Sequence, residues 1–508
     1  MLSLATSLAD LPLREVGVVV AAGAVAAAFF LPGARGRALA VLAVLVLTPL
    51  LLLADLAGTS ALDRLTARPA AAVAAALLAA AAVAVLARAI RRRPILLPAL
   101  TVAALPFRVP VEAAGESANL LVPLYLVIGA AGLAYASERL RGHAAATSAA
   151  ERRPSRLEVA LICAVVLYAL QASYSPDFDK ALENSVFFYV PFALLLKLLV
   201  AAEWSRRTLV ACLWVAVGLA LLFAAVGFYE YATRELLLNP KVIEANEFKS
   251  YFRVNSLFFD PNIYGRFLAV VMVALATLLL WSRSAGHTRA AGAGLAVLWG
   301  GLLLTFSQSS FTALLVGLAV LAALRWRPRL VAGTALVAGV TAAAVLLAFP
   351  GLVNVDLGSK SSLDKASSGR LDLMRGGAEL FLERPLWGHG SGSFSDRFTD
   401  RERTSAERAL AASHTVPITI AAEQGLIGLA AFVFVLLAAG GVLFGGLRAG
   451  RGPPGMVTLG RIFAAAAFSA LLTHTMLYAA LLEDPLTWTL LGVGLALRVA
   501  EREGAPAR

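Results

Sequence analysis

The chain has 508 residues, of which 59% are hydrophobic and only 15% are charged, and its mean hydropathy is +0.79. Soluble domains carry about 25% charged residues, so this composition excludes a chain built from ordinary soluble domains. The net charge of +12 comes from short arginine clusters between apolar runs, which argues against a nucleic-acid-binding surface and is typical of membrane-protein loops.

Apolar runs long enough to cross a bilayer recur along the whole chain, since about 20 helical residues span the hydrocarbon core. They predict an all-α, polytopic helical bundle of about 12–15 transmembrane helices, one of them over 95–111, with one long outer loop. The predicted regions are transmembrane helices over 1–230, an outer loop over 231–261, transmembrane helices over 262–350, a long outer loop over 351–420 and transmembrane helices over 421–508.

Loop charge predicts the orientation of these helices. From residue 88 onward, arginine-rich loops such as 88–93, 139–156 and 448–461 alternate with loops that carry acidic residues, such as 483–484. Basic loops stay in the cytoplasm, so the C-terminus is expected there and both long polar loops are expected on the outer side.

The first polar segment, Tyr251 to Arg266, lies before a predicted helix. In it, Arg253 and Asn255 precede Asp260-Pro261-Asn262, a pattern typical of a turn and a helix start. A guanidinium held at the membrane face is suited to phosphate, because it donates two parallel hydrogen bonds. The alternative is a loop arginine that pairs with an acidic neighbour.

The second polar segment occupies the long outer loop. A helix is predicted over 371–382. Arg370, directly before this range, and Arg375 within it are five residues apart, so on one helix they point in different directions. The glycine-rich stretch 388–392 allows a close approach of backbone to a ligand. No Gly-Lys-Ser/Thr follows it, which excludes a Walker loop, and an ordinary loop is the alternative.

The third segment, Ser413 to Gly428, places His414 where the long loop meets the next apolar run. Histidine titrates near neutral pH, so His414 is a candidate general base for a hydroxyl nucleophile, or otherwise a hydrogen-bonded interfacial histidine. His389, in the same outer loop, is its rival. His474 lies within a predicted span.

Two weaker patterns remain. Asp177-Phe-Asp179 has a spacing that some glycosyltransferases use for a divalent metal, but it is common by chance, and no metal site is predicted. The polar stretch 305–310 interrupts an apolar run, and is either a cavity lining or a polar turn.

In this order, the segments resemble the O-antigen ligase and O-antigen polymerase superfamily of bacterial envelope glycosyltransferases. The resemblance covers about 250–445 and depends on the Arg-led segment, the serine-rich break, Gly369-Arg370, Pro385-Leu-Trp-Gly-His-Gly390, and His414 before Glu423-Gln-Gly-Leu-Ile-Gly428. The family often has Asn directly after the His, where this chain has Thr415.

The resemblance implies an inner-membrane enzyme that transfers a glycan, with inversion and without metal or other cofactor, from an undecaprenyl-diphosphate carrier to an acceptor hydroxyl. The acceptor belongs to a glycan, lipid or protein, and the reaction takes place on the periplasmic side. The resemblance assigns the diphosphate to Arg253 and Arg370, with Arg266 and Arg375 as second-tier ligands, and acceptor activation to His414.

Three alternatives stay open from the sequence. A polymerase of the same superfamily differs from a ligase only in its acceptor. A transporter needs ionisable residues within its spans, where Lys197 and His474 are the obvious ones. A structural partner of polysaccharide export needs none of the arginine and histidine residues.

Overall fold

The computed structural model describes residues 13–55, 67, 69–113, 116–142, 152–238, 242–243, 246, 251–326, 370–402, 416–447, 454–478 and 480–503. For residues 55, 109–113, 116–120, 370–372 and 477–478 it describes the backbone alone. The predicted span that follows Arg325, and His414 with it, lies outside these ranges.

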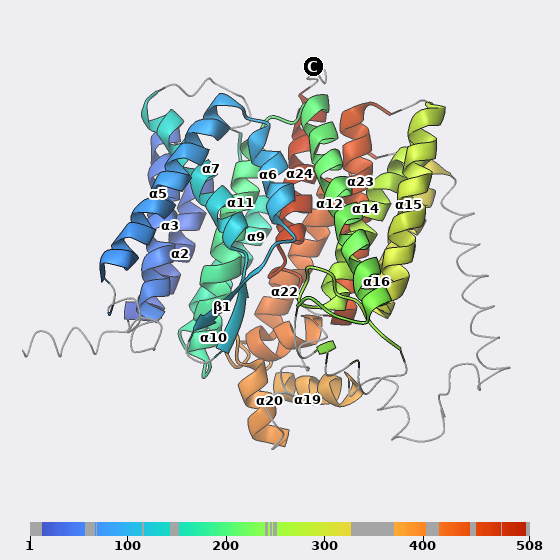
Figure 1. The fold of residues 1–508 in the computed structure, drawn as a ribbon. Helices are drawn as coiled ribbons and strands as arrows, with labels where there is room; N and C mark the ends of the chain where they lie inside the picture. Colours follow the sequence, from blue (N-terminus) through green and yellow to red (C-terminus); the bar gives the residue numbers. More distant parts are fainter. Residues whose placement is uncertain are drawn as a thin grey trace, which may run out of the picture.

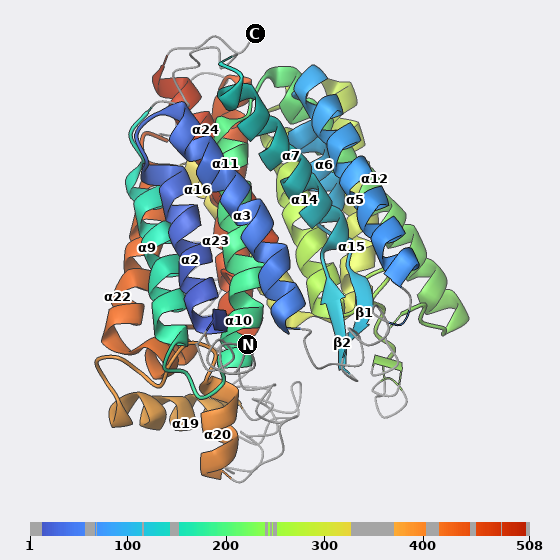
Figure 2. The ribbon, with the colours of Figure 1, turned by 90° about the vertical axis from the view of Figure 1, so that its left-hand side faces the viewer.

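The described helices pack side by side into an antiparallel bundle (Figures 1 and 2). Its members are α2 (Leu13–Phe30), α3 (Ala34–Asp55), α5 (Pro69–Arg92), α7 (Val122–Leu140), α9 (Arg156–Ala172), α11 (Val190–Ala201), α12 (Arg206–Thr233), α14 (Pro261–Trp281), α15 (Ala285–Thr305), α16 (Gln308–Arg325), α22 (Val416–Phe444), α23 (Met456–Tyr478) and α24 (Pro485–Arg502).

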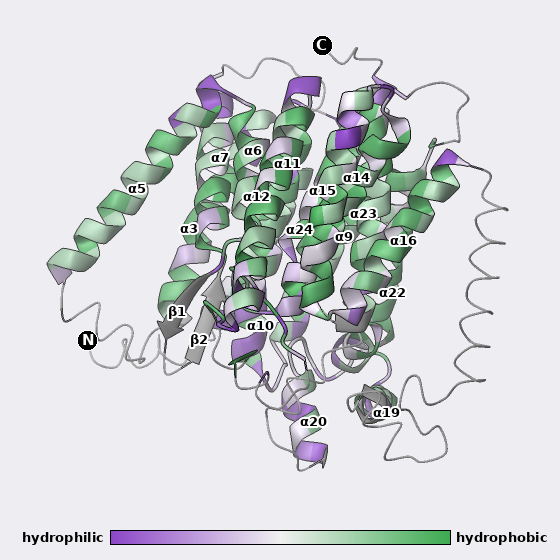
Figure 3. Cartoon of the chain, turned by 45° about the vertical axis from the view of Figure 1, so that its right-hand side comes forward, coloured by the Kyte–Doolittle hydropathy of each residue, from purple (hydrophilic) through white to green (hydrophobic). Residues whose placement is uncertain are grey.

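Among the described residues, ten helices are long and apolar enough to cross a membrane, and α7, α9 and α24 run beside them. Figure 3 shows hydrophobic residues along the body of the bundle and hydrophilic residues at its two ends. The predicted polytopic membrane bundle is therefore confirmed.

Polar caps set where many of these helices begin. Six side chains accept a hydrogen bond from a backbone N–H of the first turn, which would otherwise lack a partner. They are Ser155, Ser205, Asp260, Ser284, Ser307 and Asp484. In α9 the cap is a full capping box, because Glu158 also accepts from the Ser155 backbone N–H at 2.7 Å.

One predicted span is wrong. Instead of a helix over 95–111, the chain forms α6 (Leu96–Ala104), whose nine residues reach about halfway through a bilayer core. A β-hairpin follows, in which β1 (Val109–Ala113) pairs antiparallel with β2 (Glu116–Leu120). Pro106 and Pro110 explain the change, because proline lacks a backbone N–H and disfavours helical conformation in the residue before it.

The two ends of the bundle differ. The C-terminus lies at one end, where α5, α7, α11 and α24 finish (Figures 1 and 2). The other end holds the β-hairpin, α10 (Phe178–Asn184) with the short π-helix that follows it (Ser185–Tyr189), α19 (Arg370–Glu383) and α20 (Phe394–Glu402). Leu380, Phe394 and Phe398 pack against Ala422 and so fix α19 and α20 on α22.

Candidate active site

Arg253 is half-buried beside the start of α14, and its side chain is held in one orientation. Its Nε donates to the Thr305 carbonyl oxygen at 2.9 Å, and its Nη2 donates to Asn262 Oδ1 at 3.1 Å. Among the described residues, the other N–H groups of this guanidinium have no partner. Arg253 is thus an oriented cation whose remaining N–H groups are available to an anionic ligand.

The backbone around Arg253 is fixed by a carboxylate that sequence reasoning missed. Glu230, fully buried in α12, accepts hydrogen bonds from the Ser256 N–H at 2.7 Å and the Leu237 N–H at 3.1 Å. Ser256 has a left-handed backbone conformation (φ 51°), and its hydroxyl donates to the Phe223 carbonyl at 2.8 Å. Glu230 lies in the last turn of α12, and its partners come from the segment that follows the helix, so the sequence pattern contains no signal for this role.

The serine-rich break between α15 and α16 is a buried polar turn. Ser307 caps α16, and its hydroxyl lies 2.8 Å from that of Ser310. Ser310 in turn donates to the Asn262 carbonyl at 3.2 Å, and Ser309 lies 3.2 Å from His474 Nε2. These bonds connect the turn to the start of α14 and to α23, so the polar-turn alternative describes this stretch.

Arg266 is buried and paired. Its Nη1 lies 2.7 Å from Asp484 Oδ2, and both side chains are almost completely shielded from solvent. Asp484 has a second function, because its Oδ1 accepts from the Leu486 N–H at 2.9 Å and caps α24. A buried charge is costly unless it is paired, so this ion pair ties α14 to the start of α24.

The glycine-rich loop packs against protein backbone. Gly388, Gly390 and Gly392 all have positive φ, and a Cβ on Gly388 would lie 2.2 Å from the Glu423 carbonyl oxygen. On α22, Gly425 breaks the helix with φ +65°, and its Cβ would lie 2.4 Å from the Leu386 carbonyl oxygen. These glycines therefore allow two backbones to touch, which explains the stretch without a ligand.

Glu423 holds this loop in place. Its carboxylate accepts from the Gly392 N–H at 2.9 Å and the Phe394 N–H at 3.1 Å, and its backbone carbonyl accepts from the Gly390 N–H at 2.8 Å. Gln171 of α9 connects the loop to α22, because its amide donates hydrogen bonds to the carbonyls of Trp387 and Gln424. The loop from 383 to 394 is therefore joined to both α22 and α9.

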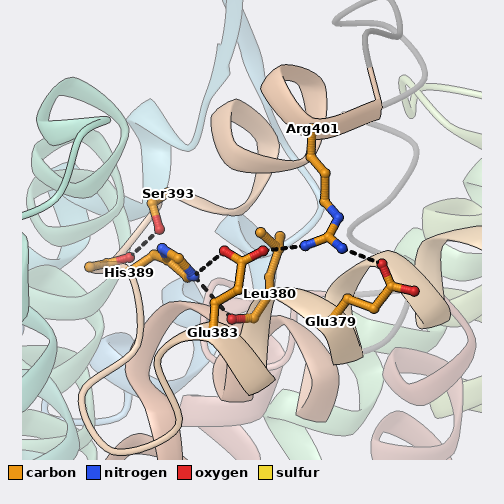
Figure 4. Close-up of polar contacts among 7 residues, drawn as sticks. Glu379, Leu380, Glu383, His389, Ser393 and Arg401 are labelled. Carbon is orange, nitrogen blue, oxygen red and sulfur yellow. Dashed lines mark hydrogen bonds and ion pairs between the residues drawn. The ribbon is translucent and has the colours of Figure 1, made fainter.

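His389 has a structural role in the same loop (Figure 4). Its Nε2 lies 3.0 Å from the Leu380 carbonyl oxygen, and a carbonyl only accepts, so Nε2 carries the proton. Burial lowers the pKa of His389 below its usual 6.5, although the Leu380 carbonyl acts in the opposite direction. The residue is only 5% exposed and its Nε2 is engaged with the end of α19, so His389 is poorly accessible to an acceptor hydroxyl.

An ion-pair group lies beside His389 on the outer side of α19. Arg401 of α20 pairs with Glu379 at 2.6 Å and also with Glu383, which is itself 3.6 Å from His389 Nε2 (Figure 4). These contacts join α19 to α20 at a half-exposed surface, where each pair stabilises the fold by about 1 kcal/mol at most.

The polar residues around Arg266 and Asp484 lie near the glycine-rich loop that is docked on α22. Glu483, next to Asp484, is within electrostatic reach of Glu423, and the Tyr189 hydroxyl lies 3.5 Å from Glu483 Oε1. Burial raises the pKa of Glu483. The region around Arg253 and Arg266 and the region around the docked loop therefore share one end of the bundle.

The remaining predicted residues lie on or next to α19. Arg370 is its first residue, described in its backbone alone, and Arg375 is exposed on the same helix. Gly377 of α19 packs against Ile418 in the first turn of α22. His414 lies outside the described residues, two positions before α22 begins.

Asp177 and Asp179 each have a structural partner. Asp177 caps α10 by accepting from the Lys180 N–H at 3.0 Å, and burial raises its pKa. Asp179 pairs with Arg14 at 2.7 Å. No group of residues that could hold a metal ion is found in the described ranges.

These helices and contacts define a polytopic membrane protein with an arginine-bearing polar region gathered at one end of its bundle. The O-antigen ligase family model, Wzy_C, matches residues 293–433, from within α15 to within α22. The match confirms the predicted resemblance to the O-antigen ligase and polymerase superfamily over this part of the chain. No curated protein matches the chain.

Proposed function

We propose that this protein is a glycosyltransferase that moves a glycan from an undecaprenyl-diphosphate carrier to an acceptor hydroxyl on the outer face of the bacterial inner membrane. The reaction breaks the bond between the anomeric carbon and the diphosphate oxygen, and forms a bond from that carbon to the acceptor oxygen. Attack from the opposite face inverts the anomeric configuration. No metal takes part.

Arg253 and Arg370 bind the diphosphate in this proposal. As the anomeric bond breaks, negative charge grows on the leaving diphosphate, and fixed guanidiniums stabilise that charge without reorganising. The observation that carries this role is the geometry of Arg253, whose Nε and Nη2 are bound to protein while its other donors stay available.

The second-tier arginines differ in what they offer. Arg375 is exposed on the helix that begins with Arg370, so a direct contact with the ligand is open to it. Arg266 already pairs with Asp484, and its contribution is the position of α14, which carries Asn262 and hence orients Arg253.

His414 takes the acceptor proton. Two observations support it over His389: His389 is engaged with the Leu380 carbonyl, and α22, which follows His414 closely, packs against the helix that begins with Arg370. In this proposal, His414 activates the acceptor on one side of the anomeric carbon, and Arg370 binds the leaving diphosphate on the other side.

Glycan transfer in proteoliposomes tests the proposal, with an undecaprenyl-diphosphate-linked oligosaccharide as donor and EDTA present. The wild type should transfer, His414→Ala should lose activity by roughly 100-fold or more, and its abundance should be unchanged. His287→Ala is the matched control, because His287 is exposed at the basic end of the bundle. Full activity in His414→Ala, or loss of activity in EDTA, contradicts the mechanism.

The size of the product separates the remaining functions. A ladder of lengthened carrier-linked glycans identifies a polymerase, and a single transfer to another acceptor identifies a ligase. A transporter or scaffold gives no product with any acceptor. Its own function should be unaffected by each of the substitutions Arg253→Ala, Arg370→Ala and His414→Ala.

A further inference from the structure

A second candidate site lies at the opposite end of the bundle from Arg253. A cavity of about 810 Å³ opens between α22, α24 and the segment that precedes α9. Here α22 packs against both α9 and α24 (Figure 2). Its lining comprises Arg152, Arg153, Ser155, Arg156, Phe434, Leu437, Ala438, Gly441, Val442, Leu495, Arg498, Val499, Arg502 and Glu503.

The charge of this lining is strongly unbalanced. It includes five arginines and a single acidic residue, Glu503. Arg152 is neutralised by Glu158 at 2.8 Å, and Arg498 donates to the Gly441 carbonyl. Arg153, Arg156 and Arg502 are exposed, and their side chains have no hydrogen bond or ion pair among the described residues. Such a group of guanidiniums attracts a phosphate.

The lining also changes from apolar to basic along α24, towards the end of that helix. On α22 the cavity wall is apolar from Phe434 to Val442, and on α24 the apolar Leu495 precedes Arg498 and Arg502. Phe434 is 43% exposed and Leu437 is 70% exposed, so the apolar wall opens sideways to the lipid-facing surface of the bundle. A ligand that fits this wall has an anionic head and a hydrocarbon tail.

We propose that this cavity binds an anionic glycerophospholipid of the adjacent leaflet. Its phosphate lies among Arg153, Arg156 and Arg502, and its acyl chains lie along α22. Basic pockets between transmembrane helices at the cytoplasmic face are suited to such head groups, and the positive charge of this end agrees with that face. The apolar wall favours a lipid over a free phosphate, which would leave that wall exposed.

Binding of a fluorescent acyl-chain phosphatidylglycerol to the full-length protein in neutral detergent tests the proposal. The key variant is Arg153→Gln with Arg502→Gln, because both side chains are exposed and hold no described part of the fold. Arg206→Gln with Arg207→Gln is the matched control, since these arginines are exposed at the start of α12, at the same end and outside the cavity.

The wild type should bind phosphatidylglycerol and bind the phosphatidylcholine analogue at least tenfold more weakly. The cavity variant should lose roughly tenfold in affinity for phosphatidylglycerol, while the control pair stays within about twofold. Leu437→Gln should also weaken binding, and millimolar glycerol 3-phosphate should not displace the lipid. Equal loss in the control pair, equal binding of phosphatidylcholine, no effect of the cavity variant, or displacement by glycerol 3-phosphate would each overturn the proposal.

Discussion

Arg253 illustrates how a single side chain is prepared for an anion before one arrives. Its guanidinium is anchored to a carbonyl and an amide, so a ligand meets donors that are already oriented. We expect Arg253→Ala to lower kcat/KM for glycan transfer roughly 100-fold or more. Arg253→Lys should recover little, because an ammonium cannot reproduce the planar fork.

The control for this prediction lies in the same loop. Arg234 is exposed and stacks on Tyr231, with its guanidinium carbon 4.2 Å from the ring centroid. Arg234→Gln removes the same charge together with contacts to the Tyr231 and Phe252 rings, and it leaves in place the two acceptors that hold the Arg253 guanidinium. Steady-state transfer should therefore stay within about twofold of the wild type. A similar loss in both variants would mean that net charge, and not the geometry of Arg253, supports activity.

His389 makes a prediction about pH. Its pKa is lowered in the folded protein, so the unfolded chain binds more protons as the pH falls below about 6.5. The stability that neutral His389 contributes is therefore complete above that pH and declines below it. Between pH 7.5 and 5.5, the melting temperature of the wild type should fall more than that of His389→Gln, and equal slopes would contradict this role.

At the scale of elements, the contact between the glycine-rich loop and α22 depends on the absence of side chains. Gly388→Ala adds a Cβ 2.2 Å from the Glu423 carbonyl oxygen in a left-handed residue. Strain and overlap together should destabilise the docked loop by about 2–4 kcal/mol. Thermal unfolding in detergent should show the loss, and transfer activity should fall with it.

Gly440 provides the comparison on the same helix. A Cβ at Gly440 meets nothing within 4 Å, so Gly440→Ala should leave the melting temperature unchanged or slightly higher. Equal destabilisation by both substitutions would show that α22 tolerates no alanine in place of glycine, and that the loop contact is not the cause.

Helices that follow from hydropathy alone were predictable. The expected span over 262–281 is α14 (Pro261–Trp281). The expected helix over 371–382 is α19 (Arg370–Glu383), which lies in the polar outer loop and does not follow from hydropathy. The hairpin after α6 was not predictable from apolar content, because a short apolar run fits a strand as well as a helix. Glu230, Glu423 and Asp484 acquire their partners from segments distant in sequence, and local patterns do not contain that information.

At the scale of the whole molecule, the two ends of the bundle should face different compartments. In a chain with Cys163 and Cys212 replaced by serine, Asp400→Cys reports on α20 and Arg207→Cys reports on the start of α12; both positions are exposed. A membrane-impermeant maleimide added to spheroplasts should label Asp400→Cys nearly completely and Arg207→Cys only after lysis. The reverse pattern would place the proposed active site in the cytoplasm.

The ion pair between Arg266 and Asp484 has a consequence for biosynthesis. Arg266 leaves the ribosome about 220 residues before its partner, an interval of roughly 10–40 s at ordinary rates of synthesis. During that time α14 carries an unpaired cation close to its start, which keeps that end of the helix near the membrane surface. Nascent chains that stop before α24 should therefore hold α14 at a shallower depth, so the insertion of α14 is completed only when α24 is made.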